Sequence, residues 1–166
     1  MIKTIFSENV ANNTMLIERD FEGSLEQVWQ AWTDSEILEQ WWAPLPFKAV
    51  TKTMNFSEGG CWHYYMLGPA GEQHWCMVNY FKIEPQKRFT GDDLFCDEEG
   101  NPNNEFPAML WDVMFAGTGA STKVSVKIDF KSKEDLDKIA EMGFKEGFSM
   151  AHENLDRLLE KTKILV

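Results

Sequence analysis

Residues 108–130 read AMLWDVMFAGTGASTKVSVKIDF, and large apolar side chains occupy alternate positions on both sides of a glycine-containing turn. These apolar positions are Trp111, Val113, Phe115, Val124, Val126, Ile128 and Phe130. An alternation of apolar and polar residues is typical of a strand with one face buried and the other in water. Because the connection through Gly117 and Gly119 is short, the stretch predicts two antiparallel strands joined as a hairpin.

The same period of two extends from this hairpin back to residue 47. The strands that it predicts cover 47–56, 61–67, 74–84, 88–96, 108–116 and 122–130. Short connections rich in Gly and Pro separate them, such as Glu58-Gly59-Gly60 and Gly68-Pro69-Ala70-Gly71. Short connections at this spacing build an antiparallel meander. A further candidate at 14–21 brings the sheet to six or seven strands.

The C-terminal part of the chain changes to a helical period. Ser132 is in place to cap a first helical piece, and Gly143 is a predicted bend. Beyond it an apolar stripe runs along Phe144, Phe148, Ala151, Leu155, Leu158 and Leu159. A helix from 144 to 162 would be about 28 Å long, enough to cross a whole sheet.

Two short helices are predicted between the first strand and the meander. Ser24 and Gln27 fit a capping box, and Thr33 with Glu36 fits a second one. Apolar residues follow each box at helical spacing, and Pro44 and Pro46 end the second helix. Trp29, Trp32, Trp41 and Trp42 belong to these helices. Aromatic residues at such spacing are more often core than pocket, and Trp42, at a helix end, is the best candidate for a pocket contact.

These elements predict one α+β domain over residues 1–166, with residues 1–13 less ordered. Its curved antiparallel sheet has one apolar face, and the terminal helix is the element long enough to cover it. A twisted sheet and a straight helix diverge along their length. Large side chains must fill the resulting gap, or a cavity is left there.

Composition and charge exclude several functions. The formal net charge of −11 repels nucleic acid and anionic membranes, and we expect neither as a partner. The sequence lacks an apolar run long enough to span a bilayer, and its first residues do not resemble a signal peptide. Three cysteines, an odd number, do not suggest a disulfide framework, so a cytoplasmic location is expected.

Several short motifs resemble those of small START-like (SRPBCC) domains, in order, from about residue 14 to 162. They are Val28-Trp29, Ala31-Trp32-Thr33-Asp34, Trp41-Trp42, Glu58-Gly59-Gly60 with Trp62, Met66-Leu67-Gly68-Pro69, Ile83-Glu84-Pro85 and Asn154-Leu155-Asp156-Arg157-Leu158. Within that superfamily the chain is most similar to the stand-alone bacterial branch named after the activator of the heat-shock-protein-ninety ATPase. The resemblance implies a helix-grip fold with a hydrophobic ligand bound between sheet and helix. The chain departs from the usual pattern at Ser35, where the family often has Pro, and at Trp75, Cys76 and Met77.

The predicted function is the binding of an apolar or aromatic small molecule between the sheet and the terminal helix. The residues predicted to contact it are Trp42, Trp62, Tyr64, Met66, Trp75, Met77, Trp111, Val113, Gly147, Phe148 and Ala151. We assign no catalytic residue, cofactor or metal. The chain is expected to be a monomer or a homodimer.

Two alternative functions stay open. The first is a small cyclase, hydratase or hydrolase that uses Tyr64, His63 or His152 as acid or base. The second is a protein-interaction or co-chaperone-like module. Three carboxylates could also act as acid or base, namely Asp92, Asp93 and Asp112. The favoured interpretation is that they lie on a solvated face of the sheet.

One further motif suggests a metal. Cys61-x-His63 and His74-x-Cys76 would form a tetrahedral zinc site if the register of their hairpin brought all four to one face. This spacing matches no known zinc knuckle. The favoured interpretation is therefore that the four residues are half-exposed on the outer face of the sheet and bind no metal.

Overall fold

The computed structural model describes residues 3–9 and 11–164, and over these residues the chain forms an eight-stranded antiparallel sheet and four helices. The strands are β1 (Ile5–Asn9), β2 (Thr14–Phe21), β3 (Lys48–Met54), β4 (Cys61–Leu67), β5 (Gln73–Glu84), β6 (Arg88–Phe95), β7 (Met109–Gly117) and β8 (Thr122–Asp129). The helices are α1 (Leu25–Thr33), α2 (Ser35–Leu38), α3 (Lys133–Glu141) and α4 (Phe144–Ile164). The α+β helix-grip architecture is confirmed, with more strands than the six or seven predicted.

The additional strand is β1, which pairs with β2 at the edge of the sheet. Its sequence, IFSEN, is short and mostly exposed, so it has no apolar alternation by which it could be recognised. Residues 1–2 and 10, which belong to the segment predicted to be less ordered, lie outside the described residues.

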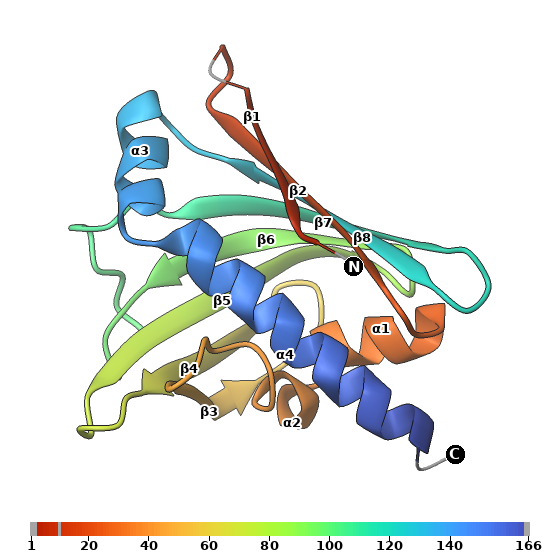
Figure 1. Ribbon diagram of the computed structural model, residues 1–166. Helices are drawn as coiled ribbons and strands as arrows, with labels where there is room; N and C mark the ends of the chain where they lie inside the picture. Colours follow the sequence, from red (N-terminus) through yellow and green to blue (C-terminus); the bar gives the residue numbers. More distant parts are fainter. Residues whose placement is uncertain (1–2, 10, 165–166) are drawn as a thin grey trace.

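The strands follow the order β1-β2-β8-β7-β6-β5-β4-β3. From β3 to β8 they form the predicted meander, and β2 closes onto β8, as in the pair Ile17 and Val126. The sheet is curved, and α4 runs across its concave side, with α1 and α2 near one end of that helix and α3 near the other (Figure 1). Helix α4 therefore faces the concave side of the sheet, and the buried core lies between them (Figure 1).

Local sequence accounts for where the helices begin and end. Ser24 and Gln27 form the predicted capping box at the start of α1, and Ser132 caps α3. The second cap is Asp34 rather than Thr33, because the Asp34 carboxylate accepts the Glu36 amide while the Thr33 hydroxyl bonds back to α1. Helix α2 is also shorter than expected and ends at Leu38.

Gly143 separates α3 from α4, as the sequence predicts. Its φ of +86° lies in the left-handed region, where a side chain would be strained. The bend lets α3 turn away from the axis of α4 (Figure 1). The first turn of α4, which begins at Phe144, is consequently directed toward the sheet.

Candidate functional site

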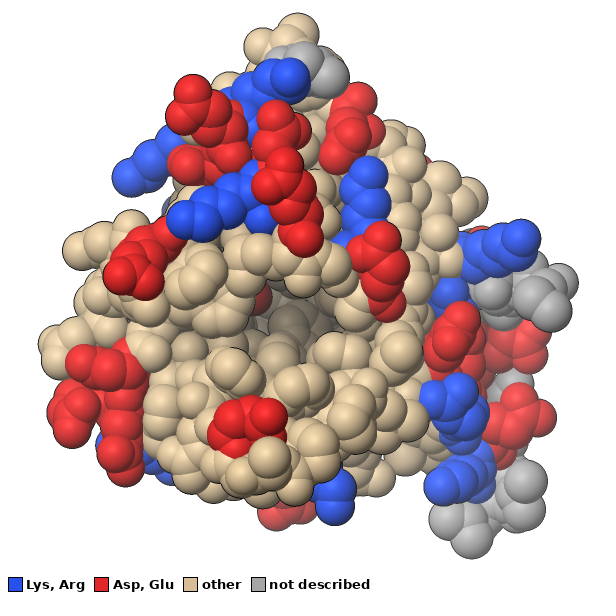
Figure 2. Space-filling view, turned by 60° about the vertical axis from the view of Figure 1, so that its left-hand side comes forward, with Lys and Arg blue, Asp and Glu red and all other residues tan. Residues whose placement is uncertain are grey.

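A cavity of about 200 Å³ lies between the concave face of β4–β7 and the junction of α3 and α4. The side chains around it are mainly aromatic or thioether groups. The lining residues are Trp42, Pro44, Tyr64, Met66, Cys76, Asp93, Leu94, Phe95, Met109, Trp111, Ile139, Met142, Gly143, Phe144, Gly147 and Phe148. Figure 2 shows a hollow on this side of the molecule, rimmed mostly by side chains other than Lys, Arg, Asp and Glu. The apolar space therefore opens to the surface.

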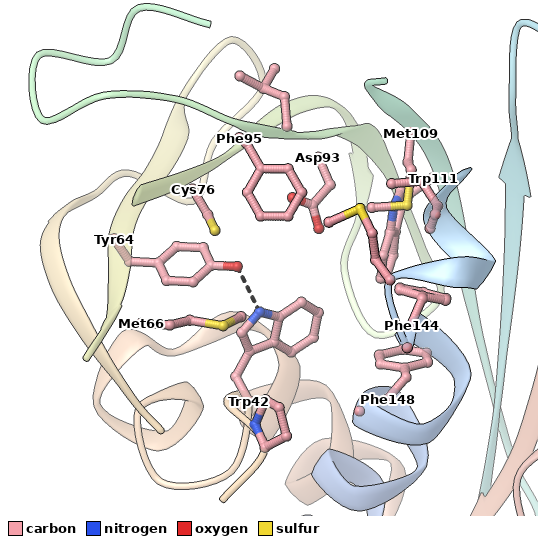
Figure 3. A pocket seen from close by; sticks show the side chains of 16 residues that line it. Trp42, Tyr64, Met66, Cys76, Asp93, Phe95, Met109, Trp111, Phe144 and Phe148 are labelled. Carbon is pink, nitrogen blue, oxygen red and sulfur yellow. Dashed lines mark hydrogen bonds between the residues drawn. The ribbon is translucent and has the colours of Figure 1, made fainter. Parts of the chain in front are cut away.

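Two aromatic pairs form opposite walls of the cavity. Phe144 and Phe148 form the wall on α4, and Trp42 and Tyr64 form the wall that faces it. Phe144 and Phe148 stack one turn apart on α4, with ring centroids 5.4 Å apart, and Phe148 also meets Trp111 of β7 edge-on at 5.6 Å. Figure 3 shows Trp42 and Tyr64 on the side opposite Met109 and Phe144. The pocket is thus built from side chains that come from several separate elements.

A hydrogen bond joins the polar atoms of Trp42 and Tyr64 in their wall of the cavity. The Trp42 indole Nε1–H donates to the Tyr64 hydroxyl over 2.8 Å (Figure 3). Behind it the Trp62 ring stacks on Tyr64 with centroids 3.9 Å apart. Burial, followed by the negative charges of Cys76 and Asp93 when ionised, raises the pKa of Tyr64 well above 10. The phenol is therefore neutral at physiological pH.

Asp93 directs its carboxylate into the cavity (Figure 3). It lies on β6, opposite Val78 of β5 and Met109 of β7. Burial, and secondarily the charge of Asp92, raises the pKa of Asp93 to about 7. The site therefore contains a carboxyl group that changes its protonation state near neutral pH.

A smaller space of about 20 Å³ lies behind the main cavity. Trp42, Asp93 and Trp111 border both spaces, so they form the partition between them. Among the described residues, the buried indole N–H groups of Trp111 and Trp32 have no hydrogen-bond partner. Two hydrogen-bond donors therefore have no partner beside the smaller space, which is the inner end of the pocket.

The predicted site residues fall into three groups. Those that line the cavity are Trp42, Tyr64, Met66, Trp111, Gly147 and Phe148. Trp62, Val113 and Ala151 are buried in the core next to it. Trp75 and Met77 lie on the other face of the sheet.

The prediction that Trp75 and Met77 point to the concave face is wrong. In the β4–β5 hairpin Tyr64 pairs with Cys76, and directly paired residues share a face. Trp75 accordingly packs against Tyr65 and His63, at 4.7 and 4.9 Å between ring centroids. The connection between Leu67 and Gln73 sets this register, and a shift of one residue reverses every side chain.

The same register divides the predicted metal motif. Cys61 and His63 lie on the outer face, and His74 and Cys76 lie on the concave face. Within residues 3–9 and 11–164 no group of three or more Cys, His, Asp or Glu is arranged to hold a metal ion. The four residues therefore do not form a common site.

Sequence reasoning missed several lining residues, and Asp93 is the most important of them. Its acidic character predicts a solvated face for it, as for Asp92. Asp93 nevertheless shares the parity of Phe89 and Phe95 on the same strand, and those two residues are apolar. Strict alternation through 88–96 would have directed Asp93 inward.

The histidines considered as acid or base lie outside the cavity lining. The His63 ring Nε2 lies 3.0 Å from the carbonyl oxygen of Asp97 on the outer face. His152 is a buried residue of α4, and its Nδ1 lies 2.9 Å from the Thr4 hydroxyl. Burial, assisted by the charge of Arg19, lowers the pKa of His152 to about 3. Of the three predicted candidates, Tyr64 alone borders the pocket.

Comparison with known proteins gives one family and many structural relatives. The family model for activator of Hsp90 ATPase homolog 1-like protein matches residues 22–160. A solution structure of a protein from Arthrobacter aurescens is 31% identical, with a TM-score of 0.89 over 95% of this chain and 91% of that one. A crystal structure of a protein from Mycobacterium smegmatis is 27% identical, with a TM-score of 0.86 over 96% and 97% of the two chains. No curated protein matches the chain.

A more distant structure extends the likeness of fold. The AHSA1 protein from Silicibacter pomeroyi is 15% identical, with a TM-score of 0.72 over 90% of this chain and 99% of that one. None of the helices in the described part of the chain is long and apolar enough to span a membrane.

Proposed function

The chain belongs to the activator of Hsp90 ATPase homolog 1-like family, and we propose that it binds an apolar or aromatic small molecule in the cavity between its sheet and α4. The observation that carries this proposal is the open, aromatic-lined cavity of about 200 Å³. Its volume suits a ligand built on one ring, because an apolar cavity of about 150 Å³ accepts benzene. Pockets with few polar groups among apolar walls are typical of small-molecule sites.

The apolar walls set a scale for the affinity. An aromatic side chain buries roughly 150 Å² or more, and at about 25 cal/mol per Å² this gives about 4 kcal/mol. Such a free energy corresponds to a dissociation constant of about 1 mM. A physiological ligand that binds more tightly must also engage the polar groups at the inner end of the pocket.

The test compares two substitutions at Gly147, which lines the cavity from α4. A Cβ at this position would lie 3.6 Å from Pro44, an ordinary contact, so Gly147→Ala should fold and leave most of the space open. Gly147→Leu should fill it. We expect toluene, followed by tryptophan fluorescence and by ligand-detected NMR, to bind the wild type and the alanine variant and at least tenfold more weakly to the leucine variant.

Native mass spectrometry of freshly purified protein would complement this titration by detecting a co-purified small molecule. Equal binding of toluene to both Gly147 variants would contradict the proposed location. If neither the wild type nor Gly147→Ala binds toluene or retains any small molecule, the proposed function is wrong.

The two alternative functions remain predictions. An acid–base enzyme would have to depend on Tyr64 or Asp93, because His63 and His152 lie outside the lining. An interaction module would need an exposed apolar patch. On the outer face, the exposed Leu110 and Met114 of β7 are separated by Asp112, which forms an ion pair with Arg88.

A further inference from the structure

Asp93 is the acidic member of an otherwise uncharged lining. Neither the main cavity nor the smaller space behind it has a Lys, Arg or His among its lining residues. No hydrogen bond from a described residue reaches the Asp93 carboxylate, whereas Asp92, on the opposite face, accepts one from the Asn79 side chain over 2.8 Å. Ionised Asp93 is thus a partly buried anion without a counter-ion among the lining residues, which is an unfavourable state.

The other titratable groups near Asp93 cannot neutralise it. They are Tyr64 on β4, Cys76 and Tyr80 on β5, Asp92 on β6 and Cys96 just after β6. Burial raises the pKa of each of these phenols and thiols, so all four are neutral at physiological pH and would be anions if they titrated. The lining side chains from β7, α3 and α4 are apolar. A positive charge must therefore come from outside the lining.

The remaining walls suit a cation. Trp42, Phe95, Trp111 and Phe148 surround the space into which the carboxylate points (Figure 3). The faces of aromatic rings attract ammonium groups, and this attraction grows when water is excluded. A carboxylate next to several rings combines a charge-assisted hydrogen-bond acceptor with such a cage.

We propose that the cavity selects protonated organic amines with a one-ring apolar body over neutral molecules of the same shape, and that Asp93 binds the ammonium group. This inference rests on the proposed function and names its ligand class. The apolar body would occupy the space between Met66, Met109 and Phe144, and the ammonium group would lie at the Asp93 carboxylate. The ligand would supply the counter-ion that the lining lacks.

The experiment uses two probes of nearly equal shape, 2-phenylethylamine and 2-phenylethanol, and isothermal titration calorimetry at about pH 8. We expect the amine to bind the wild type at least tenfold more tightly than the alcohol. Asp93→Asn keeps the shape and removes the charge, so it should weaken amine binding by roughly tenfold to a hundredfold. The alcohol should bind this variant as well as it binds the wild type.

Asp92→Asn is the matched control, because Asp92 is the adjacent carboxylate and faces away from the cavity. We expect the affinity of this variant for the amine to change by less than about threefold, as for a screened surface charge. Thermal unfolding of Asp93→Asn verifies that it is folded, and we expect it to be at least as stable as the wild type.

A pH series gives a second measurement on the unmodified protein. Since the pKa of Asp93 is raised to about 7, the carboxylate loses its charge toward lower pH. The apparent dissociation constant of the amine should rise about tenfold from about pH 8 to about pH 6, in proportion to the fraction still ionised. The alcohol should not follow this trend.

The outcomes separate the two proposals. Equal affinity for amine and alcohol, or amine binding unaffected by Asp93→Asn, overturns the amine inference and leaves the proposed function standing. Alcohol binding that strengthens toward pH 6 also overturns it, because protonated Asp93 would then be a donor to neutral ligands. If neither probe binds while toluene does, the amine inference fails and the proposed function stands. If toluene does not bind and no small molecule co-purifies, both fail.

Discussion

The groove between the sheet and α4 is solid at one end and hollow at the other, although both ends consist of the same kinds of side chain. At the solid end Phe21 packs against His152, with ring centroids 5.4 Å apart, and Trp41 and Leu155 are fully buried. At the hollow end Trp111, Phe144 and Phe148 surround a cavity of about 200 Å³. Aromatic content therefore does not determine where the cavity lies.

The difference arises because a further helix fills the space between the sheet and α4 at one end only. At the solid end α1 inserts its tryptophans between the sheet and α4, and Trp29 reaches Phe115 of β7 at 4.9 Å between ring centroids. At the hollow end α3 turns away at Gly143, and α4 presents Gly147 to the gap. A helix that diverges from a twisted sheet leaves space unless another element fills it.

The largest effect should come from deleting the same side chain in packed core and in the cavity wall. Met15 is fully buried on β2, and Met109 lines the cavity on β7. Met15→Ala should lower the free energy of unfolding by about 2–5 kcal/mol, because it creates a void in packed core. Met109→Ala should lower it by about 1–2 kcal/mol, because that side chain already borders empty space. Urea denaturation measures both, and equal losses would contradict the distinction between packed core and cavity wall.

The two ends should also respond to pH in opposite directions. Asp93 has its pKa raised from 3.8 to about 7, so its contribution to stability is present below about pH 4 and is lost as the pH rises toward 7. His152 has its pKa lowered from 6.5 to about 3, so its contribution is present above about pH 6.5 and is lost as the pH falls toward 3. Each pKa shift corresponds to at most about 4–5 kcal/mol, and we expect less for Asp93 because it borders the cavity.

Two variants assign these pH effects. Asp93→Asn should remove the loss of stability between about pH 4 and 7, and His152→Phe should remove the loss below about pH 6.5. Thermal unfolding across this pH range is the measurement. An unchanged pH profile in Asp93→Asn would mean that the carboxyl group is not desolvated at the hollow end.

The smallest effects concern the helix caps. Ser24 caps α1 at the solid end, and Ser132 caps α3 beside the cavity. Each Ser→Ala substitution should lower stability by about 1 kcal/mol. We expect Ser132→Ala, but not Ser24→Ala, also to weaken toluene binding, because α3 contributes Ile139 to the lining. Equal affinities in the two variants would show that α3 does not shape the cavity.

Local patterns in the sequence predicted most of the fold. Alternation at Trp111, Val113 and Phe115 identified β7, and the capping residues Ser24 and Ser132 identified two helix starts. These features succeed because they depend on neighbours within a few residues. Strand β1 escaped detection because an exposed edge strand has no buried face to impose an apolar alternation.

The candidate site was predicted less completely. Trp42, Tyr64, Met66, Trp111, Gly147 and Phe148 line the cavity, whereas Trp75 and Met77 point away from it. The error arises from the register of one hairpin, which composition does not specify. Asp93 was missed because an acidic residue is usually solvated, although its position in the alternation directed it inward.

By itself, the sequence determined most of the elements, the acidic surface and the family, because periodicity, caps and short motifs are local properties of the chain. Only the tertiary structure decided which residues share the concave face, where the sheet and α4 separate, and that Asp93 lies at the resulting gap. Strand register and the closeness of packing depend on contacts between residues distant in sequence, and a linear pattern does not encode these contacts directly.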